Sequence, residues 1–150
     1  MMWNDDEQAV LTEITRFATE VLAPKAAELD ETASFATCHL PAMTALGLMG
    51  LNLPEAEGGL GLSGPMLYRA VEIIAGACAS TASMLTAHFL ATDSLHLGGD
   101  AALKARILPR AAQGALGAFA LTEPGAGSNP ADMRTTARRE GTGYRLRGSK

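Results

Sequence analysis

The chain has 150 residues, of which 47% are hydrophobic and 5% are aromatic, and its formal net charge is −4. This length accommodates one ordinary domain and a fragment of a second, and excludes a larger set of domains. Alanine and leucine dominate the apolar residues, which favours packed helices over an all-β sandwich.

Charge is distributed unevenly along the chain. Residues 1–75 contain 11 acidic and 3 basic side chains, whereas residues 76–150 contain 5 acidic and 9 basic ones. The basic second half is compatible with an anionic partner, such as a phosphate-bearing ligand or nucleic acid. Solvated strand faces would produce the same bias.

The first helix is predicted to begin at Asn4, whose side chain can cap it, with Glu7 at the spacing of a capping box. Pro24 should end or kink this helix, and a shorter helical stretch should continue toward Asp30. One apolar stripe at helical period follows the cap, formed by Val10, Ile14, Phe17 and Val21 with Leu11, Ala18 and Leu22 beside them.

A second helix is predicted over residues 40–46, stopped by Gly47. Residues 47–64 contain six glycines and cannot form a regular helix, yet their leucines indicate an ordered loop. Pro65 suits the first position of the next helix, which has a buried stripe formed by Leu67, Ala70, Val71 and Ile74.

The next predicted helix, residues 80–97, is apolar nearly all round and has Asp93 as its only formal charge. Such a helix belongs inside a bundle. A membrane span is the competing interpretation, but polar side chains interrupt the apolar run that a span of roughly 20 residues needs. After it, Asp100 caps a last helix through Leu103 and Ile107, which Pro109 disrupts.

The histidines and cysteines do not form a metal-binding pattern. His88 and His96 lie eight positions apart without a carboxylate or thiol partner at helical spacing, and His39 is similarly isolated. We expect core or boundary histidines and no metal site. Cys38 and Cys78 lie in apolar surroundings and are predicted to be reduced, buried thiols of a cytoplasmic protein. The first residues show no export or organelle signal.

The pattern changes to β-structure after Gly114. Residues 116–123, LGAFALTE, are predicted to form a buried strand, and residues 133–150 a hairpin that turns at 140–143. In the second arm Tyr144 and Leu146 alternate with Arg145 and Arg147, which is typical of a strand with one wet face. We therefore expect a helical domain at residues 1–114 and an incomplete β-domain at 115–150.

The loop TEPGAGSN, residues 122–129, joins these β-segments. Gly125 and Gly127 remove side chains where a backbone turns tightly or approaches a ligand, and Thr122 and Ser128 add hydroxyls. Taken alone, this composition is compatible with a ligand-binding loop and equally typical of an ordinary turn.

Several segments in order resemble the acyl-CoA dehydrogenase family of flavoproteins. FALTEPGAGS at 119–128 is similar to a signature of that family, and LNLPEAEGGLGLS at 51–63 resembles its Gly-rich loop. CASTASMLTAH at 78–88, GGDAALKARILP at 98–109 and YRLRGSK at 144–150 extend the likeness along the chain. The resemblance implies a mainly α fold: a helical bundle like the family's amino-terminal domain, followed by the first strands of a β-barrel domain.

The resemblance also implies a function. Members of the family bind FAD and dehydrogenate the α,β bond of an acyl-CoA thioester to the trans-2-enoyl-CoA, and they pass electrons to an electron-transfer flavoprotein. It further implies that the backbone at Phe119 and Leu121 and the side chain of Thr122 hold the flavin ring. Gly127 would allow close approach, and Ser128 would lie between the flavin loop and the acyl-CoA.

Two residues depart from the family pattern. Asn129 stands where an aspartate is common, so an acceptor remains without its charge, and Cys78 replaces a frequent aspartate ahead of the core helix. The family's catalytic base lies in a later helical bundle, so we expect no catalytic residue in this chain and the base beyond Lys150. The 150 residues alone should therefore be inactive, and the whole protein a dimer or tetramer of identical subunits.

Two alternatives stay open. An acyl-CoA oxidase or flavin monooxygenase of the same superfamily would show the same residues but use another electron acceptor. A non-catalytic, truncated helical module would keep the fold without the chemistry. We expect no nucleic-acid partner and no membrane span in either case.

Overall fold

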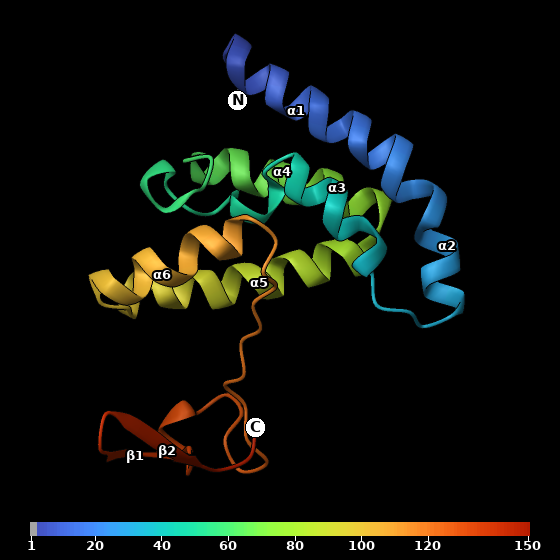
Figure 1. Ribbon diagram of the computed structural model, residues 1–150. Helices are drawn as coiled ribbons and strands as arrows, with labels where there is room; N and C mark the ends of the chain where they lie inside the picture. Colours follow the sequence, from blue (N-terminus) through green and yellow to red (C-terminus); the bar gives the residue numbers. More distant parts are fainter. Residues whose placement is uncertain (1–2) are drawn as a thin grey trace. The chain divides into compact units, whose positions relative to one another are not determined.

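The computed structural model describes residues 3–150, which divide into two compact units, one ending at Ala118 and the other spanning Phe119–Lys150. The first unit is helical and the second contains an antiparallel hairpin, which confirms the predicted fold class (Figure 1). The helices are α1 (Asp5–Phe17), α2 (Ala23–Glu31), α3 (Leu40–Ala45), α4 (Gly64–Ala77), α5 (Ala79–Gly98) and α6 (Ala101–Ala112), and the strands are β1 (Thr136–Glu140) and β2 (Gly143–Arg147).

Helix α1 begins with the predicted capping box. The Asn4 side chain accepts a hydrogen bond from the Glu7 backbone N–H at 2.9 Å, and the Glu7 carboxylate accepts one from the Asn4 N–H at 3.0 Å. Two N–H groups that the helix itself cannot satisfy thereby gain acceptors, which fixes where the helix begins.

A π-helical turn, Ala18–Leu22, separates α1 from α2 and shifts the apolar stripe. Leu22 is fully buried, whereas Val21 is 38% exposed, so the predicted stripe is wrong at its last position. A π turn contains more residues than an α turn and therefore rotates the positions that follow it. Pro24 lies in the first turn of α2, where its missing N–H has no helical acceptor to lose.

The loop between α3 and α4 is ordered, as predicted. Gly47 ends α3 in the left-handed region at φ +71°, and Leu48, Leu51 and Leu53 are buried beyond it. At Gly59 a side chain would collide with the backbone carbonyls of Gly50 and Leu53, so the loop folds on itself only with glycine there. Short 3₁₀ turns at Leu48–Gly50 and Glu55–Glu57 complete it.

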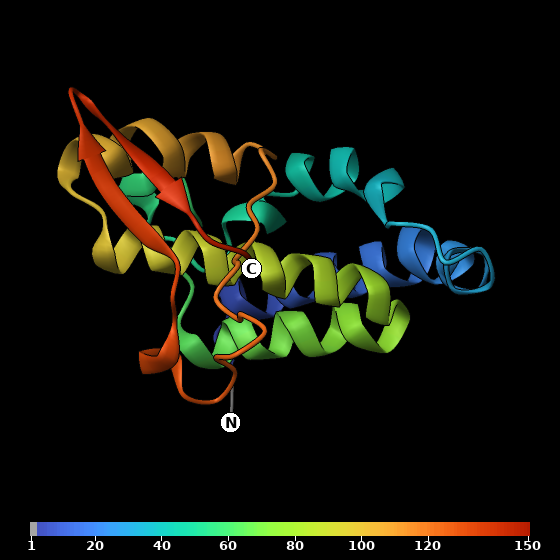
Figure 2. The same cartoon turned by 90° about the horizontal axis from the view of Figure 1, so that it is seen from below.

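The core of the first unit lies between α1, α4 and α5, with α4 packed against both of the others (Figures 1 and 2). Phe17 and Phe89 are both buried in it, as expected. Helix α5 packs in the bundle, as predicted, but one of its apolar faces is exposed, because Leu90 and Leu97 are 55% and 82% exposed. The α2, α4 and α6 helices contact α5, and within residues 3–150 they leave this face uncovered.

Helix α6 begins at its predicted cap, with the Asp100 carboxylate accepting from the Leu103 N–H at 2.7 Å. The prediction that Pro109 disrupts it is wrong, since the helix continues to Ala112. Proline removes one backbone donor and its ring crowds the carbonyl four residues earlier. Burial of Leu108, Ala111 and Ala112 stabilises the final turn and offsets this cost.

The two cysteines differ in environment. Cys78 is buried at the junction of α4 and α5, where its Sγ accepts a 3.2 Å hydrogen bond from Thr81, whereas Cys38 is exposed. The prediction of two buried thiols is therefore wrong for Cys38. Cys78 occupies the N-cap position of α5 without a side-chain cap bond, although aspartate, asparagine, serine and threonine are the residues that cap helices best.

In the second unit β1 pairs antiparallel with β2, from Thr136 opposite Arg147 to Glu140 opposite Gly143, as predicted. The predicted strand at 116–123 is wrong: among the described residues it has only an isolated bridge, between Glu123 and Ala126. The hairpin has no dry face either, because its residues are all exposed. Strand pairing and burial both need neighbouring segments, and residues 3–150 supply none for these positions.

Candidate functional site

The loop at 122–128 is closed by its own backbone. Glu123 and Ala126 exchange hydrogen bonds, with N–H to carbonyl distances of 3.1 and 3.0 Å, so Pro124 and Gly125 form the tip of a tight turn. Ala126 is buried, whereas Gly127 and Ser128 beyond it are exposed. The turn therefore has a fixed shape and an open outer surface.

All five residues predicted to bind cofactor or substrate are exposed within this one unit. Phe119 is 44% exposed and Leu121 39%, and Thr122, Gly127 and Ser128 are exposed as well. Within residues 3–150 the hydroxyls of Thr122 and Ser128 donate to no protein acceptor, and neither do the N–H groups of Gly127 and Ser128. The segment thus presents apolar side chains and unused donors to whatever lies against it.

The loop glycines leave room for a ligand. A Cβ at Gly125 or Gly127 would meet no protein atom within 4 Å, and neither residue has a positive φ. Packing within residues 3–150 therefore does not require glycine at either position. A flat ring lying against the loop would require it, because close approach of a ligand to backbone favours residues without side chains.

Glu123 links the loop to the segment before β1 and to Lys150. Its carboxylate accepts hydrogen bonds from the backbone N–H groups of Arg134 at 2.7 Å and Thr135 at 3.0 Å, and its Oε1 lies 2.9 Å from the Lys150 ammonium. The Arg134 N–H, followed by Thr135 and Lys150, lowers the pKa of Glu123 to about 2. A carboxylate held by these donors is a poor proton acceptor.

Lys150 also hydrogen-bonds the backbone of the candidate site. Its ammonium donates to the Leu121 carbonyl at 2.9 Å and contacts the Met133 sulfur at 3.1 Å. The Leu121 carbonyl therefore already accepts one hydrogen bond, whereas the Leu121 N–H donates to no acceptor within residues 3–150. Sequence reasoning missed this role of Lys150, because Met133, Glu123 and Leu121 lie 17, 27 and 29 positions away from it. Glu123, the lone acid of the loop, was the available signal.

Asn129 shapes the chain after the loop. Its side-chain oxygen accepts from the Ala131 N–H at 3.3 Å, and its amide donates to the Asp132 carboxylate at 2.9 Å. It thereby caps the short 3₁₀ turn Pro130–Asp132. The acceptor that remains at this position is used by the protein itself.

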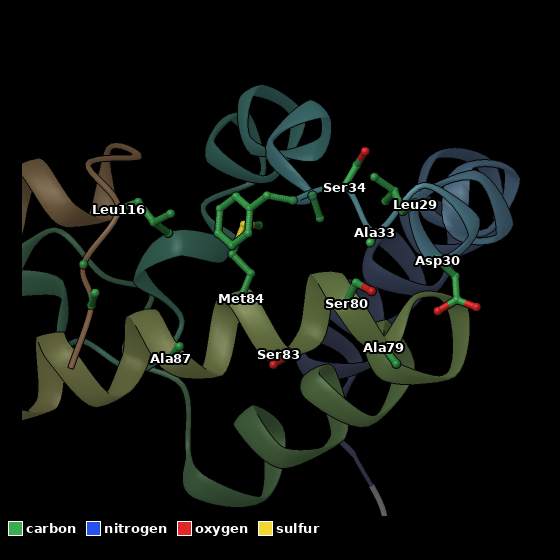
Figure 3. Close-up of a pocket in the computed structure, with 14 residues that line it drawn as sticks. Leu29, Asp30, Ala33, Ser34, Ala79, Ser80, Ser83, Met84, Ala87 and Leu116 are labelled. Carbon is green, nitrogen blue, oxygen red and sulfur yellow. The ribbon is translucent and has the colours of Figure 1, made fainter. Parts of the chain in front are cut away.

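An apolar cleft of about 820 Å³ lies in the first unit (Figure 3). Its sides come from the end of α2 and the following turn, from the first half of α5, and from residues 116–118. Leu29, Met84 and Leu116 line it, and Asp30 is its only charged lining residue. A cleft of this size and character suits an apolar group.

His88 fixes the segment that borders this cleft. Its Nε2 lies 3.0 Å from the Met49 carbonyl, and its Nδ1 accepts a 2.9 Å hydrogen bond from the Gly117 N–H. Because an N–H can only donate, Nδ1 carries no proton and Nε2–H donates to Met49. Burial lowers the pKa of His88. As expected, it is a satisfied core histidine.

Residues 3–150 contain neither a metal-binding cluster nor a membrane-spanning helix. No group of three or more His, Cys, Asp or Glu side chains is placed to hold a metal ion there. No helix in that range is both long and apolar enough to cross a membrane.

The chain belongs to the acyl-CoA dehydrogenase family. The family model for the acyl-CoA dehydrogenase amino-terminal domain matches residues 4–115, which is most of the chain. Membership agrees with the helical first unit and with the signature-like loop of the second.

Known proteins are similar over nearly the whole chain. Cyclohex-1-ene-1-carbonyl-CoA dehydrogenase of Syntrophus aciditrophicus is 38% identical over 97% of this chain and 36% of its own length. Butyryl-CoA dehydrogenase of Megasphaera elsdenii is 30% identical with a TM-score of 0.87, over 99% of this chain and 40% of that one. A chain from the structure of the electron transferring flavoprotein of Acidaminococcus fermentans is 30% identical with a TM-score of 0.91, at the same coverage. The chain thus spans about two fifths of the length of these relatives.

Proposed function

We propose that this chain forms part of an FAD-dependent acyl-CoA dehydrogenase, and that residues 115–150 begin its flavin-binding β-domain. The observation that carries the proposal is the loop at 119–128, where unused donors, exposed apolar side chains and two side-chain-free positions lie together. Family membership supports the reaction class. The substrate would be an acyl-CoA thioester, and the product its trans-2-enoyl-CoA.

The residues present fit the edge of a flavin ring. Backbone at Phe119 and Leu121 and the hydroxyl of Thr122 would hold the ring, and Gly127 would allow close approach. Bound FAD would supply the acceptor for the hydride that leaves the β carbon. The donors of the loop would stabilise charge on the ring, since hydrogen bonds to charged groups are stronger than neutral ones. Ser128 would contact the acyl-CoA.

The residues described here supply no catalytic base in this proposal. Glu123 is the acid of the loop, but its pKa of about 2 and its three donors make it a structural carboxylate. The base that takes the α proton would belong to a later part of the protein. The 150 residues alone should then turn over no acyl-CoA and bind FAD weakly.

The acyl group would lie against an apolar surface, and the cleft of the first unit is the candidate on this chain. Its lining is mostly apolar and its volume falls in the ordinary range for small-molecule sites. Relatives act on acyl groups as different as butyryl and cyclohexene-carbonyl, judged by their names. The preferred acyl group should therefore be found by comparing straight-chain with alicyclic thioesters.

The electron acceptor we propose is an electron-transfer flavoprotein, and the protein would work as a dimer or tetramer of identical subunits. The similarity to a chain from an electron transferring flavoprotein structure supports that acceptor. An oxidase or monooxygenase would instead react directly with oxygen.

A single set of mixing experiments on the purified natural protein tests the function. We expect a bound flavin whose absorbance bleaches on anaerobic addition of an acyl-CoA and returns when an electron-transfer flavoprotein is added. Rapid return with oxygen alone would identify the oxidase alternative. A protein that takes up no flavin and bleaches with no thioester would contradict the proposal and favour the non-catalytic module.

A further inference from the structure

Glu123 of the candidate flavin loop forms an ion pair with Lys150, which lies far from it in the sequence. The Glu123 side chain is 7% exposed and the Lys150 side chain 25% exposed, and the Glu123 Oε1 lies 2.9 Å from the Lys150 ammonium. The pair therefore differs from the other ion pair of the unit, between Glu140 and Arg145, whose side chains are 46% and 73% exposed. Shielding from water makes an ion pair geometrically demanding and costly to break.

The pair joins both β-segments to the loop. Glu123 receives the N–H groups of Arg134 and Thr135, which lead into β1, while Lys150 lies beyond the end of β2. The Lys150 ammonium contacts the Glu123 carboxylate, the Leu121 carbonyl and the Met133 sulfur. One cation thus fixes the loop on either side of Thr122.

The chain is shaped to let Lys150 reach this position. A Cβ at Gly148 would collide with the side chain and the Cα of Thr135. Only glycine allows the segment after β2 to pass this close to the segment before β1. At Gly143, in contrast, a Cβ would meet no atom within 4 Å.

We infer that Glu123 and Lys150 are a positioning pair, which holds Leu121 and Thr122 where they bind the flavin ring. This inference rests on the proposed function. Neither side chain would touch the ring, because both are engaged with the protein. Their effect would pass through the Leu121 carbonyl and through the Glu123 backbone, which directly follows Thr122. Small displacements of positioned groups are expensive for binding and catalysis.

A positioning pair and a purely structural pair differ in their effect on bound flavin. A purely structural pair would change the unfolding temperature of the unit and leave the properties of bound flavin unaltered once folded. A positioning pair would change flavin affinity and reduction potential in protein that is fully folded. Restoring a cation with Lys150→Arg should recover much of the affinity lost in Lys150→Met.

The test uses the natural protein with Glu123→Gln, Lys150→Met, Lys150→Arg and the double variant, and Glu140→Gln as the matched control. In flavin-free protein, amide exchange at Arg134 and Thr135 should accelerate about tenfold or more in Glu123→Gln. The FAD dissociation constant should rise about tenfold in Glu123→Gln and Lys150→Met. The double variant should be little worse than either single one, because the two changes remove one interaction. Glu140→Gln should match the wild type.

Two outcomes would overturn the inference. Faster amide exchange with unchanged FAD affinity and potential would make the pair structural only, and unchanged exchange would show that no anchor exists. Wild-type protein that binds no FAD would contradict the proposed function itself, and the exchange data would still report whether the pair fixes the loop. Full FAD binding by both wild type and Glu123→Gln would contradict the positioning pair alone.

Discussion

The imidazole of His88 accepts a 2.9 Å hydrogen bond from the backbone N–H of Gly117, a residue 29 positions further along the chain. Its other nitrogen donates to the Met49 carbonyl at 3.0 Å. The ring therefore ties the segment leaving α6 to α5 and to the Leu48–Gly50 turn. It can do so only while Nδ1 has no proton.

Protonation of His88 should consequently destabilise the first unit. Burial lowers its pKa in the folded state below the ordinary 6.5, so the unfolded chain takes up the proton first. The stabilisation is complete above pH 6.5 and decreases as the pH falls below that value. Urea unfolding followed by helical circular dichroism between pH 5 and pH 8 measures it. The His88→Gln variant should show a shallower dependence.

His39, the other buried histidine of the unit, should contribute to the same pH dependence. Burial, with a smaller effect of Lys25, lowers its pKa as well, and its Nδ1 lies 2.8 Å from the Thr81 hydroxyl. A His39→Gln variant should therefore remove a different share of the same dependence. Identical pH profiles for wild type and His88→Gln would contradict the lowered pKa of His88.

Acid should destabilise the second unit in a lower pH range than the first. The pKa of Glu123 is about 2, below the ordinary 4.5, so its contribution to stability is present above pH 4.5 and is lost as the pH falls toward 2. Amide exchange of Arg134 and Thr135, measured by NMR, should remain slow at pH 4 relative to an unstructured chain. Equal loss of protection at pH 4 in wild type and Glu123→Gln would mean that the carboxylate is not held by its donors.

Adjacent positions in the π turn give a sharp test of packing. Leu22 is fully buried and Val21 is 38% exposed. Leu22→Ala should cost about 2 to 5 kcal/mol of unfolding free energy, as for other buried leucines. Val21→Ala should cost less than about 1 kcal/mol, since surface changes are small. Chemical unfolding of the two variants measures both. A larger loss for Val21→Ala would place the apolar stripe where the sequence alone suggested.

The sequence predicts the helical unit well because its signals are local. The Asn4 and Asp100 caps, the stop at Gly47 and the burial of Phe17 follow from residues within a turn or two. The π turn escaped prediction because no single residue encodes it. The exposure of Leu90 and Leu146 was not predicted either, because burial depends on neighbours that are distant in the sequence or outside the described residues.

The exposed residues of the candidate site could be predicted from the sequence, but the contacts that fix them could not. Motif spacing indicated Thr122, Gly127 and Ser128, and the structure places them on one exposed segment. Motif spacing did not reveal that Glu123 and Lys150 meet, because that contact depends on the hairpin between them. Local patterns identify the exposed groups of the candidate site, whereas the contacts that fix the loop depend on the tertiary fold.

Ser128 is predicted to act on substrate more than on cofactor. Loss of one hydrogen bond to the acyl-CoA in Ser128→Ala should raise its KM or slow flavin reduction about tenfold, with FAD retention unchanged. Single-turnover bleaching of the flavin separates the two effects. Loss of FAD on gel filtration would instead place Ser128 against the cofactor.

Binding of the flavin ring by the loop at 119–128 is tested most directly by the reduction potential of the Thr122→Val variant. A hydroxyl hydrogen bond to the reduced ring is worth roughly 1 to 3 kcal/mol, or about 20 to 65 mV for a two-electron couple. We predict a potential lower by that amount in the folded natural protein, and no change in Thr12→Val, whose hydroxyl bonds the Gln8 carbonyl on α1. An unchanged potential together with unchanged FAD affinity in Thr122→Val would contradict the claim and return TEPGAGSN to the role of a structural turn.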